Sequence, residues 1–172
     1  METDPEYPEP PAELGLERGG KLARLWGFMT HGIPFNRHLG LEVRELAVGR
    51  AVLALPFQPA FIGDPFRPAL HGGSISMLAD TAGGAAVLAG VDAGSPVSTI
   101  DLRIDYLRPG ALVDLVAEAA LVRLGGRVGV VRIQVYQESN EGNASEEARI
   151  DEEGTCRVIA EATGVYSVRR PQ

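Results

Sequence analysis

The chain has 172 residues, of which 45% are hydrophobic and 23% charged, a balance typical of one soluble globular domain. Its single cysteine excludes an internal disulfide, and the absence of a basic run beside aromatic residues argues against nucleic-acid binding. No uncharged apolar run reaches the roughly 18 residues of a membrane-spanning helix, and the acidic, proline-rich start lacks the features of a secretory signal. We therefore expect a cytoplasmic protein with no membrane partner and no nucleic-acid partner.

The net charge of −7 is concentrated in two segments. Residues 1–13 hold five acidic residues and no Lys or Arg, and residues 138–154 hold seven acidic residues and one Arg. These segments are expected to form a disordered acidic tail and an acidic loop. The rest of the chain has a net charge of +4. That charge is compatible with a small polyanionic ligand and equally with a chance distribution of solvated residues.

The N-terminal part of the chain predicts a helical extension over residues 14–38, ahead of a main domain over residues 39–170. Within the extension, residues 21–31 have apolar residues at the i, i+3, i+4 and i+7 spacing of an amphipathic helix. Gly32 and Pro34 mark the end of this helix.

The main domain begins with two short apolar runs, 41–48 and 51–57, that are typical of strands. Gly49-Arg50 between them predicts a hairpin turn. Residues 58–70 contain three prolines and are expected to form a loop.

A long helix follows over residues 72–90, and it is apolar around nearly its whole circumference, as a buried core helix is. Four strands are then predicted, at 97–108, 111–124, 127–137 and 156–168. In the first of them the apolar residues from Ile100 to Tyr106 alternate with polar ones, which predicts one buried face. A two-residue hairpin is expected at Gly125-Gly126. This order predicts an α+β fold in which a long antiparallel sheet wraps around one central helix.

Asp80 is an acidic residue inside the apolar helix, and Gly72 and Gly73 stand at the start of that helix. Backbone N–H groups there have no intrahelical partner and lie at the positive end of the helix dipole, so they can stabilise an oxyanion. Glycine also lets a ligand approach the backbone closely. The seven residues from Gly73 to Asp80 span about 10 Å along the axis, too far for both to touch one reacting carbon.

Two such helices running antiparallel across a two-fold axis would remove this separation. The glycines of one subunit would then face Asp80 of the other, in an isologous dimer with two sites. Small residues would permit close packing between the two helices: Ala79, Ala82, Gly83 and Ala86. In the alternative interpretation the glycines only form the helix entry, and Asp80 is a buried acid satisfied by the hydroxyl of Thr81 or Ser76.

The run HGGSISMLADTAGGAA, followed by VSTIDLRIDYLRPG, resembles the hotdog-fold acyl-CoA thioesterases of the phenylacetate-degradation type. The similarity spans about residues 39–168. It implies the hotdog fold, a homodimer or homotetramer, and hydrolysis of an acyl-CoA thioester to a carboxylate and free coenzyme A. It implies no metal and no cofactor, since coenzyme A is part of the substrate.

The resemblance also implies roles for particular residues. Asp80 matches the catalytic nucleophile or general base, and Gly72, with Gly73 close by, matches the oxyanion site. Ser98 matches a hydroxyl that orients the attacking water in some members. His71 matches the motif histidine, for which a structural or orienting role is favoured over that of a general base.

Further residues are candidates for substrate binding. Thr81 follows Asp80, and Arg103 and Arg108 could contact the phosphates of coenzyme A, because a guanidinium suits phosphate geometry. The alternative for either arginine is a solvated side chain on the surface of a strand. The 21–31 helix could cover the acyl pocket with Trp26 and Met29, although ordinary packing against the sheet is favoured.

The sequence departs from the family pattern at Pro65, because many members have an Asn six residues before the motif histidine. Asp64 could replace that Asn after a one-residue shift, or it could be a turn residue before the proline. This departure motivates a second hypothesis, a non-catalytic acyl-CoA-binding or regulatory hotdog protein. A hotdog dehydratase or hydratase fits the spacing from His71 to Asp80 poorly.

Two other kinds of site find little support in the sequence. The three histidines lack Cys or close His partners at ligand spacing, so no metal site is expected. Cys156 has no basic residue placed to activate it and is predicted to be a core residue of the last strand.

Overall fold

The computed structural model describes residues 7–138 and 157–169. Residues 1–6 of the predicted tail, most of the predicted acidic loop and Cys156 lie outside the described residues. The elements, in chain order, are η1 (Ala12–Leu14), α1 (Lys21–Gly27), η2 (Phe28–Gly32), α2 (Pro34–Leu39), β1 (Glu42–Ala47), β2 (Arg50–Leu55), η3 (Pro59–Phe61), β3 (Ile62–Asp64), β4 (Ala69–Leu70), α3 (Gly72–Gly90), β5 (Val97–Tyr106), β6 (Leu115–Leu124), β7 (Val128–Gln137) and β8 (Arg157–Val168).

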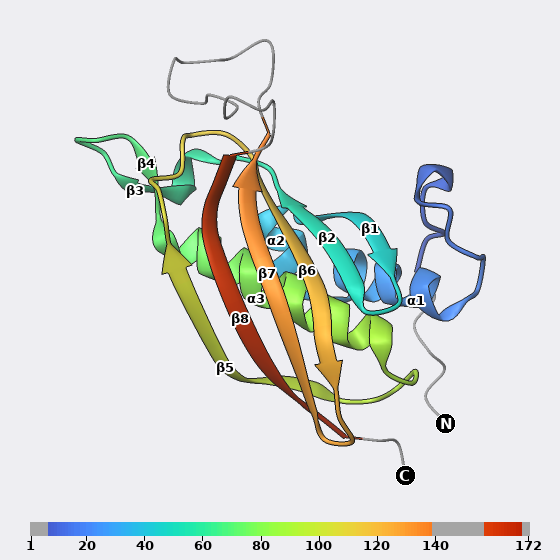
Figure 1. Ribbon diagram of the computed structural model, residues 1–172. Helices are drawn as coiled ribbons and strands as arrows, with labels where there is room; N and C mark the ends of the chain where they lie inside the picture. Colours follow the sequence, from blue (N-terminus) through green and yellow to red (C-terminus); the bar gives the residue numbers. More distant parts are fainter. Residues whose placement is uncertain (1–6, 139–156, 170–172) are drawn as a thin grey trace.

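Six strands form one sheet in the order β1-β2-β6-β7-β8-β5, and every neighbouring pair in it is antiparallel. The helix α3 lies across one face of this sheet, while β1 and β5 form its two edges (Figure 1). The α+β hotdog arrangement predicted from the sequence, a long antiparallel sheet around a central helix, is therefore confirmed. No helix in the described part of the chain combines the length and apolar character needed to cross a membrane.

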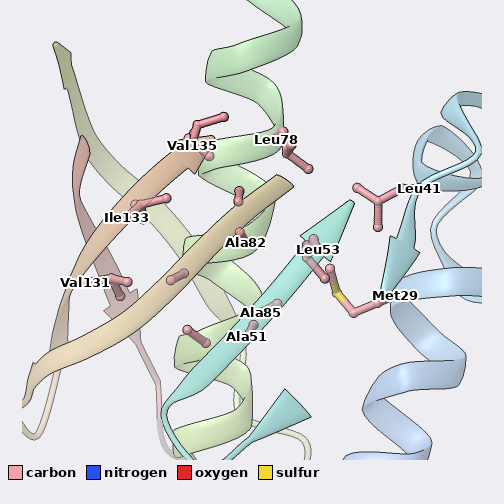
Figure 2. Packing of buried hydrophobic residues seen from close by; sticks show 14 of the residues in the cluster. Met29, Leu41, Ala51, Leu53, Leu78, Ala82, Ala85, Val131, Ile133 and Val135 are labelled. Carbon is pink, nitrogen blue, oxygen red and sulfur yellow. The ribbon is translucent and has the colours of Figure 1, made fainter. Parts of the chain in front are cut away.

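The helix α3 packs against the sheet through small residues. Ala82 and Ala85 are 0% exposed, and Figure 2 shows them with Leu78 on the side of α3 that faces the strands. Alanines there let the helix backbone approach the sheet closely.

Two predictions about α3 were wrong. Ala79, Ala82, Gly83 and Ala86, expected to pack against a second subunit, are all buried within the single chain. The helix is also not buried around its whole circumference, because Met77, Asp80, Thr81 and Leu88 are only half-buried. These small residues pack α3 against its own sheet. The opposite side of the helix is therefore less buried.

The N-terminal extension differs from the single helix expected over residues 21–31. The α-helix ends at Gly27 and continues as a π-helix to Gly32, and a further helix, α2, begins at Pro34. Proline suits the first turn of a helix because its missing N–H has no intrahelical partner there. Trp26 and Met29 are buried in the main hydrophobic core, so the predicted packing against the sheet is confirmed.

Three connections also differ from the expected ones, and one is the turn between β6 and β7, which has the three residues 125–127 rather than Gly125-Gly126 alone. The two residues that connect β1 to β2 are Val48 and Gly49 rather than Gly49-Arg50, because Arg50 already pairs with Ala47. Gly49 has a φ of +75°, which favours glycine. The expected loop over residues 58–70 contains a small two-stranded ladder, β3–β4.

The edge strand β5 does not have the clean buried face predicted for it. Ile100 and Tyr106 are 59% and 51% exposed. A register shift between Thr99 and Asp101 breaks the alternation, and β5 pairs with β8 on one side only. An exposed edge strand with large apolar side chains is a surface that proteins usually cover.

Candidate active site

The N-terminus of α3 is capped by the side chain of His71. Its Nδ1 accepts a hydrogen bond of 2.8 Å from the backbone N–H of Gly73, which places the ring proton on Nε2. The amide of Gly73 is therefore already used within the chain. In residues 7–138 and 157–169, no acceptor is found for the N–H of Gly72, and it is the donor left for a ligand.

Asp80 lies two turns further along α3 and is held by two hydroxyl groups. Its Oδ1 accepts a hydrogen bond from Thr99 Oγ1 at 2.9 Å and lies 3.2 Å from Tyr166 Oη. Tyr166 Oη also lies 3.1 Å from the backbone oxygen of Asp80. Among the described residues, no hydrogen bond reaches Oδ2. One carboxylate oxygen is thus fixed by the protein, and the other is available to water or substrate.

In the alternative interpretation, the hydroxyl of Thr81 or Ser76 was expected to bind Asp80, and neither does so. Thr81 Oγ1 donates to the backbone oxygen of Met77 at 2.8 Å, and Ser76 Oγ donates to that of Gly73 at 3.2 Å. Both are ordinary bonds to the preceding turn of the helix. Thr81 is half-buried and adjacent to Asp80, so it remains a candidate for substrate binding.

The hydroxyl on β5 that contacts Asp80 is that of Thr99, not of Ser98. Thr99 lies directly opposite Tyr166 in the β5–β8 ladder, and opposed residues share one face of a sheet. Ser98 is opposite Ser167, one position away, and is exposed. The sequence spacing located the strand, and only the register identifies which hydroxyl points toward α3.

Sequence reasoning did not identify Tyr166 as a site residue. The sequence indicates only that Tyr166 belongs to the last predicted strand, 156–168, and the structure buries it there. Burial, together with the charge of Asp80 and the hydrogen bond to it, raises the pKa of Tyr166 well above its usual range. Its hydroxyl therefore keeps its proton and acts as a donor toward Asp80.

Asp64 is a turn residue. Its Oδ1 accepts hydrogen bonds from the backbone N–H groups of Phe66 and Arg67, at 2.9 and 3.1 Å, and its Oδ2 lies 3.1 Å from Arg67 Nε. The bonds from the two amides hold the pKa of Asp64 below its usual range. Of the two predicted alternatives, the turn before Pro65 is the one found, because both carboxylate oxygens are already engaged.

The two arginines proposed for phosphate binding are exposed, as such a role requires. Arg103 Nη2 lies 3.3 Å from Asp105 Oδ1, and Arg108 Nη1 donates to the backbone oxygen of Val158 at 2.8 Å. Across residues 7–138 and 157–169, no group of three or more His, Cys, Asp or Glu side chains is arranged to hold a metal ion.

A cavity of about 490 Å³ lies between the N-terminal extension and the C-terminal end of α3. Its apolar walls include Leu25 and Phe28 from the extension, Leu88 from α3 and Val97 from β5. Val97 stands two residues before Thr99, hence on the same face of β5 and about 7 Å away. The cavity therefore opens beside the strand segment that contacts Asp80.

Comparison with known proteins agrees with this geometry. Residues 68–144 match the model of the Thioesterase superfamily. A Salmonella typhimurium protein, the medium/long-chain acyl-CoA thioesterase YigI, is 35% identical over 140 residues, which cover 74% of this chain and 86% of that protein. The Escherichia coli protein of the same name is 34% identical over the same shares. The chain belongs to the thioesterase superfamily.

Solved structures of the thioesterase superfamily share the fold. A Shewanella oneidensis protein related to this superfamily is 28% identical and superposes with a TM-score of 0.66, covering 85% of this chain and 94% of the other. A Haemophilus influenzae thioesterase is 24% identical, with a TM-score of 0.61 and coverage of 78% and 81%. The predicted superfamily and enzyme class, a thioester hydrolase, are confirmed, while the phenylacetate-degradation type stays a prediction.

Substitution of His71 tests its capping role. His71→Asn keeps an acceptor for the N–H of Gly73, so we expect near-wild-type stability and activity, whereas His71→Ala loses about 1 kcal/mol of unfolding free energy. Urea denaturation and a thioester hydrolysis assay on both variants measure this. A 100-fold loss of activity in a stable His71→Asn protein would instead identify His71 as a general base.

Proposed function

We propose that this protein hydrolyses acyl-CoA thioesters, with Asp80 as the residue that activates the attack. The observation that supports this most directly is the carboxylate of Asp80, half-buried, with Oδ1 held by two hydroxyls and Oδ2 unengaged within the described chain. Relatives that are about 35% identical are named acyl-CoA thioesterases. Acyl-CoA is thus the proposed partner of this site.

In the proposed reaction Asp80 Oδ2 takes a proton from a water molecule as the water oxygen bonds to the thioester carbon. The carbonyl oxygen becomes an oxyanion, and the carbon–sulfur bond then breaks, so that coenzyme A leaves as a thiolate and takes up the proton. If Asp80 instead attacks the carbon directly, the carbon–sulfur bond breaks, coenzyme A leaves as a thiolate, and water hydrolyses the resulting anhydride. Both routes need neither a metal nor a redox cofactor.

The oxyanion needs a donor that Asp80's own helix cannot place near the reacting carbon. The N–H of Gly72 is the proposed donor, because the N–H of Gly73 is bonded to His71, and it would come from a second subunit. The separation of about 12 Å along α3 between Gly72 and Asp80 supports this arrangement, and so does the uncovered edge strand β5. A homodimer is therefore proposed, with two sites across its interface, and a homotetramer would be an assembly of two such dimers.

The acyl chain is proposed to enter the cavity beside β5. Leu88 lies two turns beyond Asp80 on α3, about 12 Å along the axis, and its side chain forms part of the apolar wall. Room of this extent supports a medium or long acyl chain, as in the names of the relatives. Thr81 would contact the thioester end, and Arg103 and Arg108 are proposed to meet the phosphates of coenzyme A.

Substitution of Asp80 tests the proposed reaction. We expect Asp80→Asn to lower kcat by at least about 100-fold, since the amide cannot accept a proton from water. Thiol release is measured for both proteins on short, medium and long aliphatic acyl-CoAs and on phenylacetyl-, benzoyl- and hydroxylated aromatic acyl-CoAs. Near-wild-type turnover in Asp80→Asn contradicts the mechanism.

The same assay distinguishes hydrolysis from the second hypothesis, a non-catalytic acyl-CoA-binding or regulatory protein. That hypothesis is motivated by Pro65 at the usual Asn position. A binding or regulatory protein would bind acyl-CoA by calorimetry and release no thiol from any substrate. A hydratase would convert an enoyl-CoA without releasing thiol.

Substitution of Leu88 tests the acyl-chain site. Leu88→Trp fills part of the cavity, so kcat/KM should fall about fourfold for each methylene that no longer fits. Butyryl-CoA is the internal control, because its chain is too short to reach Leu88 and its kcat/KM should not change. An equal loss for butyryl- and palmitoyl-CoA would place the acyl chain elsewhere.

A further inference from the structure

Tyr166 lies near the C-terminal end of β8 and is 1% exposed, the largest of the fully buried side chains in the described part of the chain. On β5 it is opposite Thr99, and on β7 it is opposite Gly129. Its side chain points from the sheet toward α3, where its hydroxyl meets Asp80. A buried tyrosine normally finds a hydrogen-bond partner. Here the partner is the carboxylate proposed to act in hydrolysis.

Two glycines make the space for this ring. A Cβ on Gly83 of α3 would collide with the Tyr166 hydroxyl and lie 2.9 Å from Cζ, and a Cβ on Gly164 of β8 would lie 2.5 Å from Cε2. Glycine costs about 1 kcal/mol in a helix and also weakens a strand. The space for the ring and its hydroxyl therefore depends on glycine at positions 83 and 164. A larger residue at either position would push the hydroxyl away from Asp80.

The hydrogen bonds fix the orientation of the carboxylate. Thr99 and Tyr166 approach Oδ1 from two neighbouring strands, at 2.9 and 3.2 Å, so rotation of the carboxylate would break both bonds. Bonds to an ionised acceptor are stronger than those between neutral groups. Oδ1 is thus held by two strands of the sheet, while Oδ2 has no hydrogen bond within the described part of the chain.

We propose that Tyr166 is a positioning residue for hydrolysis, which holds Asp80 Oδ1 so that Oδ2 meets the water or the thioester. The inference rests on the proposed function of Asp80. Tyr166 transfers no proton and does not touch the substrate, and it acts only through the carboxylate. Thr99 provides the second hydroxyl of the same arrangement.

The first test is Tyr166→Phe, which keeps the ring and removes the hydroxyl. We expect kcat on acyl-CoA to fall about 10- to 100-fold, the value of a hydrogen bond to a charged group, while KM changes less than about twofold. In an Asp80→Asn background the same change should cause no further loss, because the two residues act as one unit. A purely structural role would lower activity equally in both backgrounds.

The second test uses two adjacent glycines of α3 as a matched pair. Gly83→Ala would displace the Tyr166 hydroxyl, whereas a Cβ on Gly84 meets Tyr166 Cε1 only at 3.8 Å, an ordinary contact. Both changes give the same gain in helix propensity. We expect a loss of kcat in Gly83→Ala and wild-type kcat in Gly84→Ala, measured with thermal unfolding to confirm that both proteins are folded at the assay temperature.

The outcomes separate this inference from the proposed function. Wild-type kcat in Tyr166→Phe, with Asp80→Asn inactive, overturns the role of Tyr166 and leaves hydrolysis by Asp80 standing. Full activity in Asp80→Asn overturns the proposed function itself. If Tyr166→Phe does not fold, the glycine pair decides, and equal kcat in Gly83→Ala and Gly84→Ala overturns the inference.

Discussion

The close approach of α3 to the sheet is the constraint on which the rest of the structure depends. It is possible because Ala82 and Ala85, both fully buried, present only methyl groups to the strands. With larger residues the helix would stand further away, and the hydroxyls of Thr99 and Tyr166 would not reach Asp80. The contact between α3 and the sheet therefore has two results. It builds the core, and it brings the hydroxyls of Thr99 and Tyr166 to Asp80.

This packing leaves one side of α3 and the edge strand β5 only partly covered within a single chain. The half-buried side of α3 that carries Asp80 lies next to the edge strand β5, whose Thr99 contacts this acid. Apolar side chains on an edge strand, such as that of Ile100 at 59% exposure, are unfavourable in water, and proteins usually cover such an edge. A second copy of the chain would satisfy the edge and supply the missing donor together.

Much of the fold follows from local patterns in the sequence. The bounds of α3 match the predicted 72–90, since a capping residue and the two glycines mark its start and a glycine its end. The last predicted strand, 156–168, matches β8 over all of its residues. Sequence patterns did not predict the turn at Val48-Gly49 or the ladder β3–β4, because strand pairing decides both.

The candidate site was only partly predictable for the same reason. Asp80 is conspicuous as an acid in an apolar helix, but its two hydroxyl partners come from strands far away in the sequence. The choice of Thr99 over Ser98 depends on the β5–β8 register, and the role of Tyr166 depends on the space that Gly83 and Gly164 leave. A pattern of burial identifies a core tyrosine and gives no sign of what its hydroxyl touches.

The central claim is that each site combines Asp80 of one subunit with Gly72 of the other. Gly72→Pro removes the donor with little change to the helix, because proline suits this first helical position and His71 has the extended ψ of 131° that precedes proline. Mixed dimers of Gly72→Pro and Asp80→Asn, isolated through two different affinity tags, are assayed beside each parent.

The parents should be inactive, and the mixed dimer should recover about half the kcat of the wild-type dimer, because one of its two sites is intact. An inactive mixed dimer would contradict the account, since it would place both groups of each site in one chain.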